Sequence, residues 1–129
     1  MKPETCPFCS PGHGEIIQEN DLAYTRYDKY PVSPGHLLII PRRHIATVFD
    51  ASPDELAALW ALLSAAKSSL DIQFRPDGYN IGINDGASAG QTIPHLHIHL
   101  IPRFSGDMSD PRGGVRGVIP QKQKYDPDT

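Results

Sequence analysis

The chain has 129 residues, which is enough for one domain with a hydrophobic core. Its twelve basic and fifteen acidic residues give a net charge of −3, which argues against a broad nucleic-acid-binding surface. The start, MKPETCPFCSPGHG, lacks the apolar core of a secretory signal, and the most apolar window, residues 56–66, is too short to cross a bilayer. We therefore expect a cytoplasmic protein that binds neither nucleic acid nor membranes.

The first segment with a recognisable motif holds the two cysteines, Cys6 and Cys9, in a C-x-x-C spacing. In a reducing compartment this spacing indicates either a redox pair or half of a metal site. A redox pair usually follows a strand and opens a helix, whereas Pro7 lies between these cysteines and Ser10, Pro11 follow them. The segment therefore predicts a turn, which favours the metal site.

The next elements are predicted strands. Residues 15–30 alternate around the turn Glu19-Asn20-Asp21 and predict two short antiparallel strands. Residues 36–40, HLLII, form an apolar run bounded by Gly35 and Pro41, which is typical of a buried strand.

One long helix is predicted to begin after Ser52. The segment Ser52-Pro53-Asp54-Glu55 has the capping-box spacing with proline at the first helical position, and residues 75–78 supply an ending. Large apolar residues recur at helical intervals and predict one buried face: Leu56, Leu59, Trp60, Leu63 and Leu70.

Two more strands follow, at residues 79–84 and 95–101, with a glycine-rich turn at 84–90 between them. Short connections predict antiparallel neighbours, so the expected fold class is α+β, with the helix packed on one face of the sheet. We expect residues 1–104 to form a single domain that includes the N-terminal segment. The tail, residues 105–129, is expected to be partly extended and to lack a core of its own.

The segment PHLHIHLIPR contains three histidines at alternate positions, His95, His97 and His99, which share one face of a strand. A plain half-buried strand would not explain three histidines in register. A single metal ion held by all three is also disfavoured, because the outer pair is about 13 Å apart along a straight strand. The remaining interpretation divides the three between different tasks.

In this interpretation Cys6, Cys9, His44 and His95 form a closed Cys₂His₂ set suited to structural zinc, although two reduced thiols and two surface histidines remain the alternative. His97 is then available as a nucleophile, since a neutral imidazole can attack phosphorus. One of its ring nitrogens must be held as a donor, by a backbone carbonyl or by His36.

The combination of motifs resembles the histidine triad (HIT) family of nucleotide hydrolases and transferases. HLHIHLI fits the alternating histidine signature, and NDGASAGQT and PVSPGHLLIIPRRH resemble the family's preceding segments in the expected order. The resemblance runs from about Cys6 to Phe104. It implies a HIT-like antiparallel sheet that continues across a homodimer.

The resemblance also implies roles for individual residues. His97 resembles the nucleophile that takes the nucleotidyl group, His99 resembles its phosphate-contacting partner, and His36 resembles the accessory histidine that orients the nucleophile. Four residues resemble substrate-binding positions: Asp28 as the acceptor for the ribose diol, Asn84 as a polar neighbour, and Gln91 and Thr92 as phosphate or leaving-group contacts. Cys6, Cys9, His44 and His95 match the zinc ligands of bacterial members.

The sequence IPRF after the triad is closer to the dinucleoside polyphosphate hydrolase branch than to the phosphoramidase branch. We therefore expect a nucleotide hydrolase acting on dinucleoside polyphosphates or nucleoside phosphoramidates through a covalent nucleotidyl-histidine. Zinc is expected as a structural ion and Mg²⁺ only as a companion of the substrate's phosphates. The alternatives are a nucleotidyltransferase or phosphorylase of the same family, a metal-dependent hydrolase using the histidine cluster, and a nucleotide-binding regulator. The basic residues between 112 and 124 suggest a tail that reaches a polyphosphate, or else a solvated tail.

Overall fold

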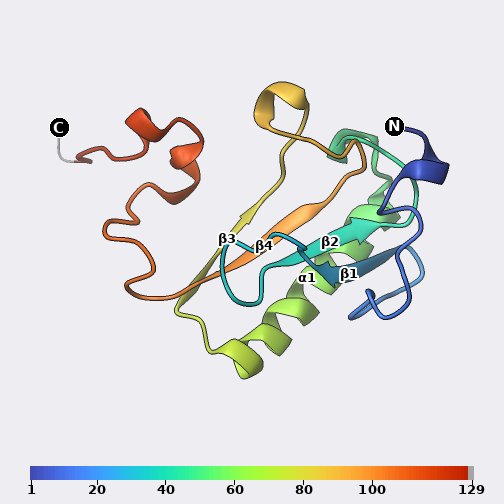
Figure 1. Cartoon of the computed structure of the whole chain (residues 1–129), viewed down its shortest axis with the longest axis horizontal. Coiled ribbons are helices and arrows are strands. Elements are labelled where there is room, and N and C mark those ends of the chain that lie inside the picture. The colour runs from blue at the N-terminus through green and yellow to red at the C-terminus, as the bar shows by residue number, and fades with distance from the viewer. Residues whose placement is uncertain (128–129) are drawn as a thin grey trace.

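The computed structural model describes residues 1–127, so residues 128 and 129 of the expected tail lie outside it. Four strands form one antiparallel sheet: β1 (Ala23–Tyr27), β2 (Leu37–Pro41), β3 (Gly78–Gly82) and β4 (Ile98–Arg103). Their order across the sheet is β1-β2-β4-β3. The helix α1 (Pro53–Phe74) packs on one face of this sheet (Figure 1), which confirms the predicted α+β class.

The start of α1 is fixed by the capping box that the sequence predicted. The hydroxyl of Ser52 accepts from the Glu55 amide at 3.1 Å, and the Glu55 carboxylate accepts from the Ser52 amide at 2.9 Å. The guanidinium of Arg43 also donates to Glu55, at 2.7 and 3.1 Å. These hydrogen bonds, first those from Arg43 and then that from Ser52, lower the pKa of Glu55 to about 2.

The buried face of α1 is rotated from the predicted one. Leu59, Leu63 and Leu70 are buried as expected, but Leu56 and Trp60 are 44% and 67% exposed, so the prediction was wrong for these two. Leu62 and Ala66 complete the buried stripe instead. At 3.6 residues per turn, positions 56 and 60 form a neighbouring stripe at the margin of the sheet contact.

Two of the predicted strands also differ. Residues 15–18 form no strand: they approach β1 through backbone hydrogen bonds at Ile17 and Gln18, beside an isolated bridge between Glu19 and Tyr24. The triad strand begins at Ile98 rather than at position 95. Before Ile98 the chain leaves β2, because the Leu96 amide donates to the carbonyl of Ile45.

The two faces of the sheet are covered differently. Leu37, Ile39, Ile98 and Leu100 pack with α1 in the main core. On the opposite face a second cluster joins the N-terminal segment to the sheet and contains Cys6, Phe8, Tyr24, Leu38 and Ile40. The sheet thus separates a helix-covered core from a face on which polar side chains can be presented.

The tail after β4 carries two short 3₁₀ turns, Gly114–Val118 and Pro120–Lys122, neither with a buried residue. It lies beside β3, at the end of the sheet away from β1 (Figure 1). Three further 3₁₀ turns occupy Pro3–Thr5, Val48–Asp50 and Ala87–Ala89. Among residues 1–127, no helix combines the length and hydropathy that a membrane crossing requires.

Candidate active site

The segment leading into β4 presents the three histidines on the face of the sheet opposite α1. Leu96, Ile98 and Leu100 are all buried in the core beneath the helix. The alternation therefore works as the sequence predicted, although only His99 lies within the strand itself.

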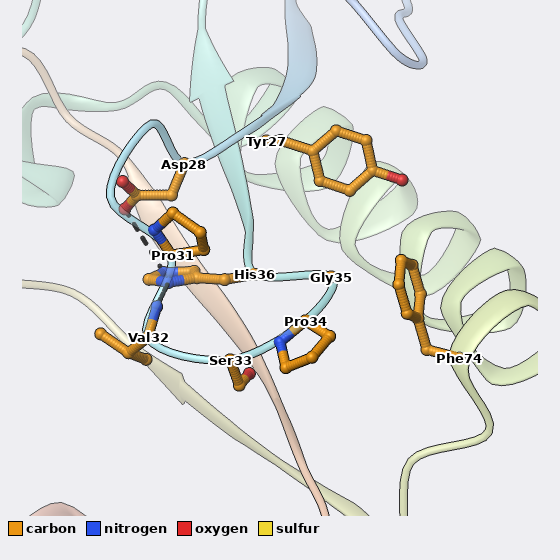
Figure 2. A pocket seen from close by; sticks show the side chains of 9 residues that line it. All are labelled: Tyr27, Asp28, Pro31, Val32, Ser33, Pro34, Gly35, His36 and Phe74. Carbon is orange, nitrogen blue, oxygen red and sulfur yellow. Dashed lines mark hydrogen bonds and ion pairs between the residues drawn. The ribbon is translucent and has the colours of Figure 1, made fainter.

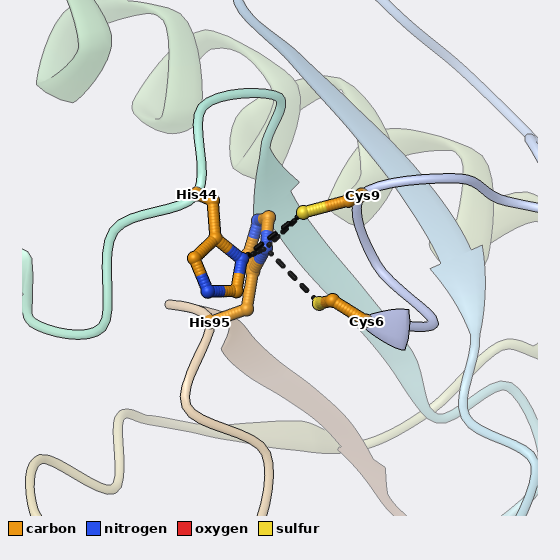
Figure 3. Close-up of side chains that lie close together, drawn as sticks. All are labelled: Cys6, Cys9, His44 and His95. Atoms are coloured by element: carbon orange, nitrogen blue, oxygen red, sulfur yellow. Dashed lines mark hydrogen bonds between the residues drawn. The ribbon is translucent and has the colours of Figure 1, made fainter. Parts of the chain in front are cut away.

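His95 belongs to a cluster with Cys6, Cys9 and His44, which come from the N-terminal turn and the loop after β2 (Figure 3). The Nδ1 atom of His95 lies 3.4 and 3.5 Å from the two Sγ atoms and 3.2 Å from Nδ1 of His44, which is 3.0 Å from Sγ of Cys9. Ligand atoms around one tetrahedral ion of zinc's size are roughly 3.3–3.8 Å apart. These four side chains could therefore hold one such ion.

The tautomer of His95 also suits a metal ligand. Its Nε2 lies 2.7 Å from the carbonyl oxygen of Pro41, and because a carbonyl only accepts, Nε2 must carry the proton. Nδ1 is then a lone-pair donor facing the thiols. Burial, followed by the neighbouring Cys6, raises the pKa of the Cys9 thiol to about 11, so Cys9 needs a nearby cation to become a thiolate.

His97 is held in the tautomer that a nucleophile needs. Its Nδ1 lies 2.8 Å from the carbonyl oxygen of His95 and must therefore donate to it. The proton on Nδ1 leaves the lone pair on Nε2. The ring is buried and packs edge-on against Phe8, with ring centroids 5.0 Å apart, and against His99 at 5.1 Å.

His36 and His99 form a second hydrogen-bonded pair, and a backbone amide orders its protons. The amide of Val32 donates to Nδ1 of His36 at 3.2 Å, so neutral His36 carries its proton on Nε2. This Nε2 lies 3.0 Å from Nδ1 of His99, which accepts. His99 is then protonated on Nε2, which is the one buried side-chain nitrogen or oxygen without a hydrogen-bond partner in residues 1–127.

Both rings are neutral at physiological pH. Burial lowers the pKa of His36, although the nearby Asp28 carboxylate opposes the shift. Burial, together with His97 and His36, lowers the pKa of His99 to about 4. Nε2–H of His99 is therefore an uncharged, buried donor to which no described protein atom is hydrogen-bonded.

Asp28 lies beside this pair, at the start of the loop that follows β1. One carboxylate oxygen accepts from the Tyr30 amide at 2.8 Å, and the other lies 3.5 Å from Nε2 of His36 (Figure 2). The same loop borders a cavity of about 540 Å³ that Tyr27, Asp28, His36 and Phe74 help to line. The structure thus places the predicted ribose acceptor next to the predicted catalytic histidines.

The loop between β3 and β4 is pinned by Gln91. Its amide oxygen accepts from the Gly86 amide at 2.9 Å, and its amide nitrogen donates to the carbonyls of Ala46 at 2.8 Å and Ile93 at 3.2 Å. The side chain expected to contact phosphate therefore holds the loop in shape. Thr92 is exposed, and Asn84 lines a cavity that also contains His36 and His99.

Two contributors to the site were missed in the sequence. Phe8 packs against both His95 and His97. The sequence did contain a signal for Phe8. It lies between two proposed zinc ligands, Cys6 and Cys9, and a third, His95, is only two positions before His97. The role of Val32 rests on its backbone amide, which carries no side-chain signal.

Comparisons with known proteins agree with this geometry. The family described as "HIT domain" matches residues 12–106. The chain is 35% identical over 100 residues to a bis(5'-nucleosyl)-tetraphosphatase [asymmetrical] from Schizosaccharomyces pombe, covering 78% of this chain and 55% of the relative. It is 36% identical over 118 residues to an AP-4-A phosphorylase from Mycobacterium tuberculosis, covering 89% and 60%. The chain therefore spans less than two thirds of the length of either relative.

A solved structure, a Zn-bound histidine triad family protein from Mycobacterium smegmatis, is 31% identical, with a TM-score of 0.74 and coverage of 84% of this chain and 82% of that one. The family match covers well over half of the sequence, including all three alternating histidines. This chain therefore belongs to the HIT family.

Proposed function

We propose that this HIT-family protein is a nucleotide hydrolase that cleaves dinucleoside polyphosphates or nucleoside phosphoramidates through a covalent intermediate on His97. The observation that carries the proposal is the hydrogen bond from Nδ1 of His97 to the carbonyl of His95, which leaves Nε2 as a lone-pair donor. The names of two relatives, a tetraphosphatase and a phosphorylase, support nucleotide chemistry at such a site.

In the first step, the Nε2 lone pair of His97 attacks the phosphorus next to a nucleoside. The bond from this phosphorus to oxygen, or to nitrogen in a phosphoramidate, breaks, and its electron pair leaves with the departing group, which takes up a proton from the site or solvent. In the second step, water attacks the same phosphorus and loses a proton to solvent, and the P–N bond breaks with its electron pair returning to Nε2 of His97. A nucleoside monophosphate is released and His97 is neutral again.

The other residues bind and orient. His99 donates from its unpartnered Nε2–H to a phosphoryl oxygen, which develops charge during the transfer. His36 acts as a positioning residue, because its Nε2–H fixes the tautomer of His99. Asp28 accepts from ribose hydroxyls, and Asn84 and Thr92 contact phosphate or the leaving group.

We further propose that Cys6, Cys9, His44 and His95 hold a structural zinc ion, in agreement with their spacing and with the tautomer of His95. When bound, zinc would supply cross-linking and not chemistry, since all four positions are filled by protein ligands. Mg²⁺ enters this proposal only as an ion carried by the substrate's phosphates.

The proposed assembly is a homodimer. Strand β3 is at an edge of the sheet, and beside it an apolar groove of about 780 Å³ is lined in part by Leu56, Trp60, Ile81 and Ile83. All four side chains are exposed. A second copy would cover both the free strand edge and this groove.

Two rival functions differ in what they require. A phosphorylase would use the same intermediate with phosphate in place of water. The relative named AP-4-A phosphorylase supports this candidate. A metal-dependent hydrolase could use the second ligand group, Asp28, His36 and His99. The Val32 amide opposes it, because Nδ1 of His36 accepts a hydrogen bond and the proton must occupy the nitrogen that would face the ion.

The test is a His97→Asn variant assayed with diadenosine tetraphosphate, an adenosine phosphoramidate and a nucleotide sugar, with and without added phosphate. The asparagine amide can still donate to the His95 carbonyl but cannot form the covalent intermediate. We expect turnover to fall by about 10³-fold or more while substrate binding measured by calorimetry is retained. Turnover by the variant close to that of the parent would refute the mechanism. If the parent protein forms a nucleoside diphosphate, and does so only when phosphate is added, it is a phosphorylase.

A further inference from the structure

The tail after residue 110 is folded on itself. The guanidinium of Arg116 donates to the carbonyls of Lys122 at 2.9 Å and Gln123 at 3.3 Å and lies 4.6 Å from the centre of the Tyr125 ring. The amide of Gln123 donates to the carbonyl of Arg112 at 3.2 Å. The tail therefore has one defined shape that a variant at Arg116 would disturb.

The basic side chains of the tail are largely engaged within it. Arg112 pairs with Asp110 at 3.0 Å, Lys124 lies 3.6 Å from the same carboxylate, and Arg116 is held by backbone carbonyls. These contacts leave the tail poorly suited to neutralise a polyphosphate. The tail instead presents two apolar side chains on its surface, the exposed Val115 and Val118.

These two valines line a cavity of about 450 Å³ together with residues of the proposed catalytic site. The other walls come from the end of β3, the loop after it, and β4. The cavity includes His99, Asn84, Ile83, Ile101, Val115 and Val118. The same cavity is thus lined both by His99 and by the tail.

The tail approaches β3 at Asn80, whose side chain is held by a chain of polar contacts. Asp107 holds Arg103 with two hydrogen bonds of 2.7 and 2.8 Å, and Arg103 donates to the amide oxygen of Asn80 at 2.7 Å. The amide nitrogen of Asn80 then lies against Gly114, where a side chain would approach it to 3.2 Å. The wall formed by the valines therefore begins next to Asn80 of β3.

We propose that this cavity receives the nucleoside of the leaving group, so that the tail makes the protein selective for substrates with a nucleoside at both ends. The inference rests on the proposed function, because it assumes transfer to His97. Aliphatic walls suit the faces of a nucleobase, and the side-chain amide of Asn84 can meet its polar edge. A phosphoramidate with a small amine as leaving group would not reach the valines.

The test is a Val115→Ser, Val118→Ser double variant assayed with three substrates. Diadenosine tetraphosphate has a nucleoside at both ends, adenosine 5'-tetraphosphate has the same phosphate chain with one nucleoside, and an adenosine phosphoramidate has a small leaving group. We expect kcat/KM for the first to fall by about tenfold, since each lost apolar contact is worth a factor of several. The other two substrates should stay within about twofold of the parent.

Two single variants complete the design. Arg116→Ala should reproduce the selective loss, because the valines lose their fixed position, whereas the exposed Lys122→Ala should leave all three substrates unchanged. An equal loss on all three substrates, or no loss on diadenosine tetraphosphate, would overturn the inference while leaving the proposed function intact. A His97→Asn variant that stays active would instead overturn the proposed function.

Discussion

At the scale of single residues, the site is defined by where four imidazole protons lie. Carbonyl oxygens fix His95 and His97, and the Val32 amide fixes His36 and, through it, His99. Each assignment follows from a partner that can only accept or only donate. The result is a lone pair on His97 and a neutral N–H on His99, which is the pairing that transfer to nitrogen requires.

The role of His36 can be tested by replacement with phenylalanine, which keeps a ring in the buried position but removes the donor to His99. We expect kcat to fall by about tenfold with little change in KM, because His99 no longer has one fixed tautomer. Measurement of kcat and KM from pH 5.5 to 8 would also show whether the acidic limb of the pH–rate profile shifts to higher pH in the variant.

His36→Gln is the matched control, since its amide nitrogen can occupy the place of Nε2 and donate to His99. We expect it to recover part of the lost kcat. If the glutamine and phenylalanine variants have equal kcat and melt at the same temperature as the parent, hydrogen bonding from position 36 is irrelevant.

At the scale of elements, α1 has two apolar stripes with different partners. The buried stripe packs on the sheet, and the neighbouring stripe at Leu56 and Trp60 borders the groove beside β3. The sequence predicted a single apolar face, because one wide apolar face and two adjacent apolar stripes give the same helical periodicity. The distinction depends on where the sheet ends, which no local pattern specifies.

This arrangement gives a prediction for Trp60→Glu. A charge in the groove should shift the protein from dimer to monomer, as measured by light scattering across a range of concentrations, without lowering the melting temperature of the monomer. Ile72→Glu is the control, because Ile72 is 80% exposed on the same helix but does not line the groove. A parent protein that is monomeric at all concentrations would contradict the dimer.

At the scale of the whole molecule, periodicity and motif spacing predicted the main helix, the buried strands and the antiparallel sheet. The sequence also placed Cys6, Cys9, His44 and His95 in one group, because the donor types allow few other combinations. The sequence could not predict the cavity at Val115 and Val118, because contacts between a tail and a distant strand produce no periodic pattern of apolar residues. The structural role of Gln91 was hidden for a similar reason, because its side chain donates to the carbonyl of Ala46, which is distant in sequence.

Removal of zinc should act on the whole fold. The proposed ligands tie the N-terminal turn, the loop after β2 and the approach to β4 together, so a strong chelator should lower the melting temperature and activity in parallel. Circular dichroism melts and metal analysis on the same samples would measure both. Activity lost with an unchanged melt would instead point to a catalytic ion.

His95 has a consequence of its own, because it faces two ways. Its ring lies against the cysteines, and its own backbone carbonyl accepts a hydrogen bond from Nδ1 of His97, the proposed nucleophile. The energetics of anchoring and of attack are thereby coupled through a single residue. Substitutions among the sulfur ligands and at position 97 should therefore not combine additively, and neither centre can evolve without adjusting the other.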